Sequence, residues 1–255
     1  MDHTEDLQRI NDALDAAVVV FEAFTPGDVE STFKSGDDPL TQADLMVDDV
    51  LRRVLPRDGE GWLSEETVDS TDRLARSRVW IVDPIDGTRE FVQGIPEWCI
   101  SIGLIVDGQA VAGGVHNPAT GERITGAIGH GVKYSGKGDV VGGTCLTDAT
   151  VGASRSELKR GEWDPFTHCV SNIVPTGSVA YKLALVAAGR LDATWTLCPK
   201  NEWDLAGGAA LLAAAGAWGV LKDGSPPTWN NEDPLVPGFI ATTAALRDEV
   251  SALLL

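Results

Sequence analysis

Cysteine and histidine are scarce in this sequence, with four of each among 255 residues. The cysteines are far apart and form no C-x-x-C pair, which argues against a disulfide framework or a zinc site and favours reduced thiols. The histidines are equally scattered, so a soft-metal or imidazole-rich site has little support. The cysteines are Cys99, Cys145, Cys169 and Cys198.

Long apolar runs are also missing. The most apolar segments, CISIGLIV and LAGGAALLAAAGAWGVL, are short or broken by glycine, so no membrane span is expected. The N-terminal segment MDHTEDLQRI is acidic and lacks the basic start and apolar stretch of a signal peptide. A cytoplasmic location is therefore the expectation.

Basic residues are too few to balance the acids. The chain has 20 lysines and arginines against 38 aspartates and glutamates, which gives a formal net charge of −18. Such a surface repels nucleic-acid backbones and anionic membranes, so neither is expected as a partner. We interpret the excess of acids mainly as a solvated surface. An anionic substrate would need local cations to be held by this chain.

The pattern of apolar and polar residues indicates a mixture of helices and strands, and the chain is long enough to bury a substantial core. Apolar residues at helical spacing predict a helix over 4–24, capped by Thr4, and a second helix over 39–55. Strand segments follow, and two apolar runs around Asp107 and Gly108 predict a hairpin.

The pattern changes after about residue 145, where helices and strands alternate. The segment DLAGGAALLAAAGA predicts a small-residue helix that opens on Asp204. We expect an α+β domain over 1–143 that carries most of the site, and an α/β domain over 144–255 that carries Asp204 and the substrate-selecting residues.

The stretch WIVDPIDGTREF places two carboxylates at the end of an apolar strand. Asp83 and Asp86 can reach neighbouring ions, and Pro84 stiffens the backbone so that the Ile85 carbonyl can join them. Mg²⁺ prefers carboxylates, carbonyls and water, and two adjacent ions can activate water and stabilise a leaving oxygen. Two further acids stand at expected strand or helix ends, namely Glu65 and Asp204.

Gly87 and Thr88 come next, at an expected helix start whose amides would form a cradle for phosphate. Glycine there lets the backbone approach a ligand closely. Asp44 lies on the apolar face of the helix over 39–55, where a carboxylate needs water or a partner. From the spacing alone, magnesium–phosphate chemistry and structural caps or turns both remain open.

Four segments resemble the signatures of the inositol monophosphatase family, in the family's order. WIVDPIDGTREF is similar to its Asp-Pro-(Ile/Leu)-Asp-Gly-Thr pattern followed by an aromatic residue, and EWDLAGGAALLAAAGA to its Trp-Asp helix ending in Ala-Gly. SEET matches the upstream Glu-Glu segment, and DPLTQAD matches Asp-Pro-x-Thr-x-Ala-Asp. Together they cover most of the chain, so the resemblance is specific.

The resemblance implies a layered αβαβα sandwich and a homodimeric, lithium-sensitive phosphatase with two or three Mg²⁺ per site. It implies in-line attack of metal-activated water on phosphorus, without a phosphoenzyme. Thr88, paired with Asp44, would help Glu65 and a metal orient this water. Gly87 and Thr88 would hold the phosphate through their amides, and Lys34 falls near a lysine that the family often carries. The implied metal ligands are Glu65, Asp83, the Ile85 carbonyl, Asp86 and Asp204.

The substrate is expected to be a small phosphate ester, whose identity the sequence leaves open. The run Arg89-Glu90-Phe91 is closer to 3′(2′),5′-bisphosphate nucleotidases than to inositol phosphatases, and places Arg89 among the expected substrate-binding residues. Arg155 and Lys182 also resemble that branch, where basic residues serve a second phosphate, although both can equally be surface salt-bridge residues.

The continuation FVQGIPEWCISIGL instead resembles the inositol type. Inositol monophosphate or a related polyol phosphate is therefore placed ahead of 3′-phosphoadenosine 5′-phosphate. Histidinol phosphate and fructose 1,6-bisphosphate stay open, because specificity depends on the walls of the pocket.

A function of another class is a catalytically silent relative that binds metal or phosphate. The presence of all expected ligands argues against it. A nucleotide-binding kinase has no support, because the chain contains no G-x-x-x-x-G-K-(S/T) and GHGVKYSG has the wrong glycine spacing for a dinucleotide fingerprint.

Overall fold

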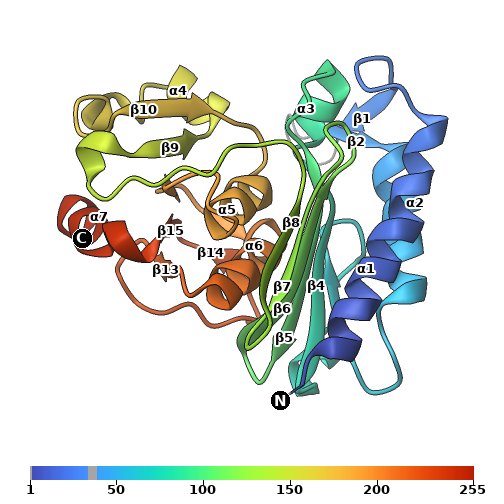
Figure 1. Cartoon of the computed structure of the whole chain (residues 1–255). Coiled ribbons are helices and arrows are strands. Elements are labelled where there is room, and N and C mark those ends of the chain that lie inside the picture. The colour runs from blue at the N-terminus through green and yellow to red at the C-terminus, as the bar shows by residue number, and fades with distance from the viewer. Residues whose placement is uncertain (1, 34–38) are drawn as a thin grey trace.

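Two β-sheets form the frame of the molecule, whose computed structural model describes residues 2–33 and 39–255 (Figure 1). Lys34 lies outside the described residues. The first sheet has the order β3-β4-β5-β6-β7-β8, with β3 and β4 parallel and the other neighbours antiparallel. Its strands are β3 (Gly61–Ser64), β4 (Arg78–Asp86), β5 (Cys99–Val106), β6 (Gln109–Asn117), β7 (Glu122–Ala127) and β8 (Gly131–Ser135).

The predicted hairpin is confirmed, since β5 and β6 pair as antiparallel neighbours across Asp107 and Gly108. Both turn residues have positive φ, 48° and 76°. This is the turn geometry that Asp-Gly favours, because its twist matches that of the flanking strands.

Helices α1 (Thr4–Val18) and α2 (Gln42–Val54) cover one face of the first sheet (Figure 1). Their apolar sides pack with the sheet residues into one buried cluster, in which Leu14, Leu51 and Trp80 are fully buried. The helical segment predicted from residue 4 is confirmed, although its last turn, Val19–Ala23, is a 3₁₀ helix.

The predicted cap of α1 is wrong. His3 occupies the N-cap position, and the Thr4 hydroxyl donates instead to Asp2 Oδ1 at 2.6 Å. The short Asp side chain competes for the hydroxyl locally, as such side chains commonly do at helix starts.

The start of α2 also differs from the prediction. Pro39–Thr41 forms strand β2, which pairs with β1 (Ser31–Phe33), and the helix begins only at Gln42. Thr41 is the N-cap, and its hydroxyl and amide both donate to Asp44, at 2.6 and 2.8 Å. This capping box fixes the direction in which Asp44 leaves the helix.

The opposite face of the first sheet is covered by α5 (Val179–Ala187) and α6 (Glu202–Ala215) (Figure 1). Small residues let α6 approach the strands very closely. A Cβ on Gly113 of β6 would lie 2.5 Å from the Gly207 carbonyl oxygen, so only glycine fits there. This close packing brings the first turn of α6 to the edge where β4 ends.

The second sheet has the order β10-β9-β11-β15-β13, with β9 parallel to β10 and β11, and β15 antiparallel to β11 and β13. Helix α7 (Arg247–Leu254) covers its outer side with Val250, which packs near Trp195. Its strands are β9 (Thr150–Ala153), β10 (Asn172–Pro175), β11 (Ala193–Thr196), β13 (Trp218–Leu221) and β15 (Phe239–Thr242).

The layers therefore run helices, sheet, helices, sheet, helix, and the predicted αβαβα sandwich is confirmed (Figure 1). The division into domains 1–143 and 144–255 stays a prediction. The short remaining elements are α3 (Thr88–Gln93), α4 (Arg155–Lys159), β12 (Lys200–Asn201), β14 (Leu235–Val236) and the 3₁₀ helices Thr71–Ala75, Leu146–Asp148, Asp164–Phe166 and Ala244–Leu246.

A buried carboxylate, Glu60, ties α1 to the edge of the first sheet. It accepts hydrogen bonds from Arg9 of α1 at 3.1 Å, Arg78 at 3.0 Å and the Trp80 indole at 2.9 Å. Burial alone would raise the pKa of Glu60, but these hydrogen bonds outweigh it and lower the pKa to about 2.

Glu60→Gln should lower the free energy of unfolding at neutral pH by about 2 kcal/mol, because buried Arg9 loses its charged partner. The unfolded state binds the proton more readily, so the stabilisation is complete above the ordinary pKa of 4.5 and is lost as pH falls towards 2. Urea unfolding across this range should show the gap between wild type and variant narrowing.

The matched control is Glu5→Gln, which removes an exposed ion pair with Arg57 on the same side of the molecule. Its effect should stay below about 0.5 kcal/mol at every pH. A gap for Glu60→Gln that persists unchanged at pH 2 would contradict the role of its charge.

Candidate active site

The ends of β3 and β4 and the starts of α3, α5 and α6 surround a cavity of about 350 Å³. Its lining contains almost every predicted site residue. Those residues are Glu65, Asp83, Ile85, Asp86, Gly87, Thr88, Arg89, Lys182 and Asp204.

Three carboxylates from two distant parts of the sequence meet in this cavity. One oxygen from each of Asp83, Asp86 and Asp204 lies within 4.8 Å of the others. Residues three apart on a regular strand point to opposite faces. The pairing of β4 with β5 shifts register between Asp83 and Asp86, and this irregularity allows both side chains to reach the same cavity.

Burial raises the pKa of two of the clustered carboxylates. Burial raises the pKa of Asp204 to about 8, helped by the nearby charges of Asp86 and Glu65. Burial also raises the pKa of Asp86. Carboxylates this close are poorly compatible with full ionisation, and a bound cation relieves that repulsion. The donor set therefore fits a hard divalent ion such as Mg²⁺.

Asp86 is held by the start of α5, from the other half of the chain. The Ser178 hydroxyl donates to Asp86 Oδ2 at 2.6 Å, and the Ala180 amide donates to the same oxygen at 2.5 Å. Ser178 also caps α5 by accepting from the Tyr181 amide at 3.0 Å. Sequence reasoning missed Ser178, because only the tertiary contact reveals its partner.

The predicted pair of Thr88 and Asp44 is in contact. Thr88 Oγ1 lies 3.0 Å from Asp44 Oδ1 and 2.9 Å from the Ile85 carbonyl oxygen. Asp44 is completely buried beneath the cavity and does not line it. Its buried charge is thus satisfied by Thr41 and Thr88, so Asp44 serves both as a helix-cap acid and as the partner of Thr88.

Gly87 sits at the N-cap of α3 in the left-handed region, with φ of 97°. A Cβ there would lie 3.1 Å from the Glu97 carbonyl oxygen and from the Trp98 side chain. Glycine is therefore required by both backbone conformation and space. Its place in the lining leaves the backbone open to a ligand.

The two residues proposed to serve a second phosphate are differently placed. Arg155 does not line the cavity, and its guanidinium donates to Glu97 at 2.6 Å. Lys182 lines the cavity but is buried, with Nζ donating to the carbonyl oxygens of Thr176 and Ser178 at 3.2 and 2.7 Å. Burial lowers the pKa of Lys182.

Two other cavity residues carried no signal in the sequence. Arg160 lies just after α4 and Lys200 in β12, each far in sequence from the Asp83 segment, and both line the cavity. Only the packing of the second half against the first sheet brings them to the site.

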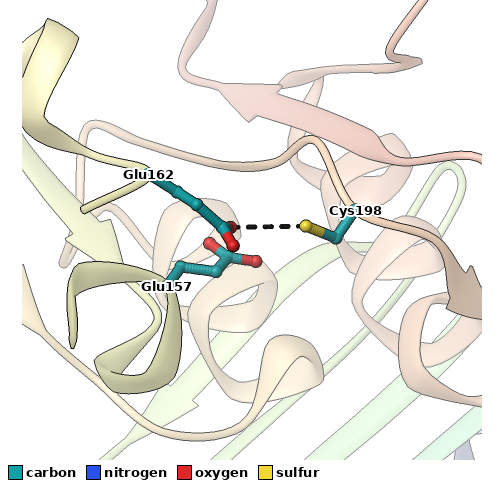
Figure 2. A group of neighbouring side chains, drawn as sticks. All are labelled: Glu157, Glu162 and Cys198. Carbon is teal, nitrogen blue, oxygen red and sulfur yellow. Dashed lines mark hydrogen bonds between the residues drawn. The ribbon is translucent and has the colours of Figure 1, made fainter. Parts of the chain in front are cut away.

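A second cluster lies beside the cavity and consists of Glu157, Glu162 and Cys198, shown in Figure 2. Glu157 is buried and accepts from the Trp163 indole at 3.1 Å and from the Thr196 hydroxyl at 2.6 Å. The Cys198 thiol donates to Glu162 at 3.3 Å. Because hydrogen bonds within the protein already satisfy these groups, the cluster needs no ion.

This geometry agrees with the comparison with known proteins. The model of the inositol monophosphatase family matches residues 5–252. The chain belongs to the inositol monophosphatase family. Members of this family are metal-dependent phosphatases, and this chain is accordingly a hydrolase of phosphate monoesters.

Individual relatives come from two branches of the family. The inositol-1-monophosphatase of Mesorhizobium japonicum is 33% identical over 231 residues, which cover 86% of this chain and 85% of the relative. The 3′-phosphoadenosine 5′-phosphate phosphatase of Mycobacterium leprae is 31% identical, covering 74% of this chain and 71% of the relative. The extragenic suppressor protein suhB of Bartonella henselae matches in structure with a TM-score of 0.78 and 27% identity, covering 99% of this chain and 98% of that one.

Among the described residues, no helix of this protein has both the length and the apolar character that crossing a membrane requires.

The variant Asp204→Asn tests whether the charge of Asp204 destabilises the metal-free protein and whether Asp204 binds the metal ion. The pKa of about 8 means that the folded protein holds the Asp204 proton more tightly than the unfolded chain, so ionisation costs stability as pH rises from 3.8 through 8. In EDTA at pH 8, the variant should melt at or above the wild-type temperature. Saturating magnesium should raise the melting temperature of the wild type by several degrees and that of the variant much less.

Asp58→Asn, at an exposed acid outside this cavity, serves as control and should keep the full magnesium response. An equal magnesium shift in Asp204→Asn and wild type would exclude Asp204 as a ligand.

Proposed function

We propose that this phosphatase uses Mg²⁺, two or three ions per site, to hydrolyse a small phosphate monoester. The single observation that carries this proposal is the meeting of Asp83, Asp86 and Asp204 beside the Gly87-Thr88 turn. The ligand set stays as predicted, namely Glu65, Asp83, the Ile85 carbonyl, Asp86 and Asp204. Bound Mg²⁺ would activate water and neutralise charge on the phosphoryl oxygens.

The chain's own residues would orient the reaction. The amides of Gly87 and Thr88 would hold the phosphate at the start of α3. Thr88 Oγ1, with its proton directed to Asp44 Oδ1, would present a lone pair to the attacking water, which Glu65 helps to orient. The water would attack phosphorus in line, opposite the leaving alcohol oxygen, and release inorganic phosphate and the alcohol without a phosphoenzyme.

Two substrates are supported by different observations. Inositol monophosphate or another polyol phosphate is supported by the relative from Mesorhizobium. A second candidate, 3′-phosphoadenosine 5′-phosphate, is supported by the Mycobacterium relative and by the four cationic side chains that line the cavity. Those cations are Arg89, Arg160, Lys182 and Lys200.

The proposal keeps a cytoplasmic location, which the four free thiols support. It also keeps the homodimer and the inhibition by lithium, both of which follow from the family resemblance.

Phosphate release from a panel of esters tests the proposed function. The panel contains myo-inositol 1-phosphate, 3′-phosphoadenosine 5′-phosphate, histidinol phosphate and fructose 1,6-bisphosphate, each with magnesium and with EDTA. We expect magnesium-dependent turnover of at least one of the first two. Asp83→Asn should lose on the order of 100-fold in rate, because even the groups that support a metal ligand are worth roughly 10- to 100-fold.

Asp58→Asn serves again as the matched control and should keep wild-type rates. Activity that survives EDTA, or an Asp83→Asn variant with full activity, would overturn the metal mechanism. Folded protein that is inactive on the whole panel would favour the binding-only alternative.

A further inference from the structure

Both acids and cations line the catalytic cavity. The carboxylates Asp83, Asp86 and Asp204 gather where β4 and α6 meet, while Arg160 follows α4 and Lys200 lies in β12, directly before α6. The proposed chemistry at the ester phosphate gives these two cations no individual role.

Lys200 lines the cavity within electrostatic reach of both the acids and the second cluster. Its positive charge favours the ionised forms of Asp86 and Asp204 and those of Glu162 and Cys198. Within the described ranges, its ammonium group forms no hydrogen bond or ion pair, although the residue is half-buried. A half-buried ammonium group gains from an anionic ligand because it has already lost part of its hydration.

Arg160 continues the cationic wall. Its Nε donates to Glu162, and its two Nη groups have no hydrogen-bond partner among the described residues. Glu162 is turned towards Glu157 and Cys198, as Figure 2 shows, so only part of the guanidinium is engaged. The free donors of a guanidinium suit a phosphate or carboxylate.

The net charge of the cavity with metal ions and ester phosphate bound also favours a second anionic group. Five carboxylates and four cations line the cavity, so two bound divalent ions and the dianionic ester phosphate together would leave an excess of one positive charge. A neutral polyol would place hydroxyls against Lys200 and Arg160, whereas a second anionic group would neutralise them.

We infer that Lys200 and Arg160 bind a second anionic group of the substrate, so that the preferred substrate carries two anionic groups, one of them the ester phosphate. This inference rests on the proposed function, which puts the ester phosphate at the Gly87-Thr88 turn. It assigns the second group to Lys200 and Arg160 in place of Arg155, which is paired with Glu97 outside the cavity.

The test compares two nucleotides with the same reacting group, adenosine 3′-monophosphate and 3′-phosphoadenosine 5′-phosphate. Wild type should prefer the bisphosphate in kcat/KM. Lys200→Met should lower kcat/KM for the bisphosphate at least tenfold, mainly through KM, and that for the monophosphate less than twofold. Lys200→Arg should restore most of the loss.

Two further variants examine the rest of the wall. Arg160→Gln should act like Lys200→Met, while Glu162→Gln should lower KM for the bisphosphate about threefold by releasing the guanidinium. Lys159→Gln is the matched control, because Lys159 is the neighbour of Arg160 and does not line the cavity. It should leave both nucleotides unchanged.

Calorimetric titration of both nucleotides with Ca²⁺ in place of Mg²⁺ separates this inference from the proposed function. If no variant turns over any ester, the proposed function fails, yet a binding preference for the bisphosphate that Lys200→Met removes would uphold the second-anion site. Equal losses on both nucleotides would assign Lys200 to the reacting phosphate and overturn the inference. A wild type without preference for the bisphosphate would overturn it as well.

Discussion

Repulsion among buried carboxylates is the constraint on which this site depends. One oxygen from each of Asp83, Asp86 and Asp204 lies within 4.8 Å of the others, and burial with like charges raises the pKa of Asp204 to about 8. Contacts made by other residues hold the three carboxylates in this arrangement. The contact of Gly113 with Gly207 presses α6 against the sheet, and the hydrogen bonds of Ser178 fix Asp86. A bound divalent ion would relieve the repulsion among the carboxylates, and this relief would contribute to the affinity of the site for the ion.

Two of the acids in the proposed site also have a structural role in the fold. Asp44 and Asp204 are each the third residue of a helix and each completes a capping box, with Thr41 and Asn201 respectively. A capping box holds the carboxylate against the helix start and so limits its directions. The same hydrogen bonds that begin the helix thus orient Asp44 towards Thr88 and Asp204 towards the cavity. For these two acids, the role of a helix-cap residue and the proposed role in the active site are therefore compatible.

Much of the fold could be predicted from the sequence, because periodic apolar residues and the Asp-Gly turn act locally. The segment from Asp83 to Thr88 could be recognised for the same reason, since its residues are contiguous. The predicted Thr4 cap was wrong because Asp2 competes for the hydroxyl. Ser178, Arg160 and Lys200 could not be assigned, because their meaning arises only when the second half of the chain packs on the first sheet. The register shift in β4 is likewise a property of its pairing with β5.

The most direct test of the central claim is a crystal structure of the protein with Mn²⁺ in place of Mg²⁺, located by anomalous scattering. The account predicts at least one Mn²⁺ within coordinating distance of Asp83, Asp86 and Asp204, and no ion at Glu157, Glu162 and Cys198. Manganese bound only at the second cluster, or absent from well-ordered crystals at saturating concentration, would contradict the account.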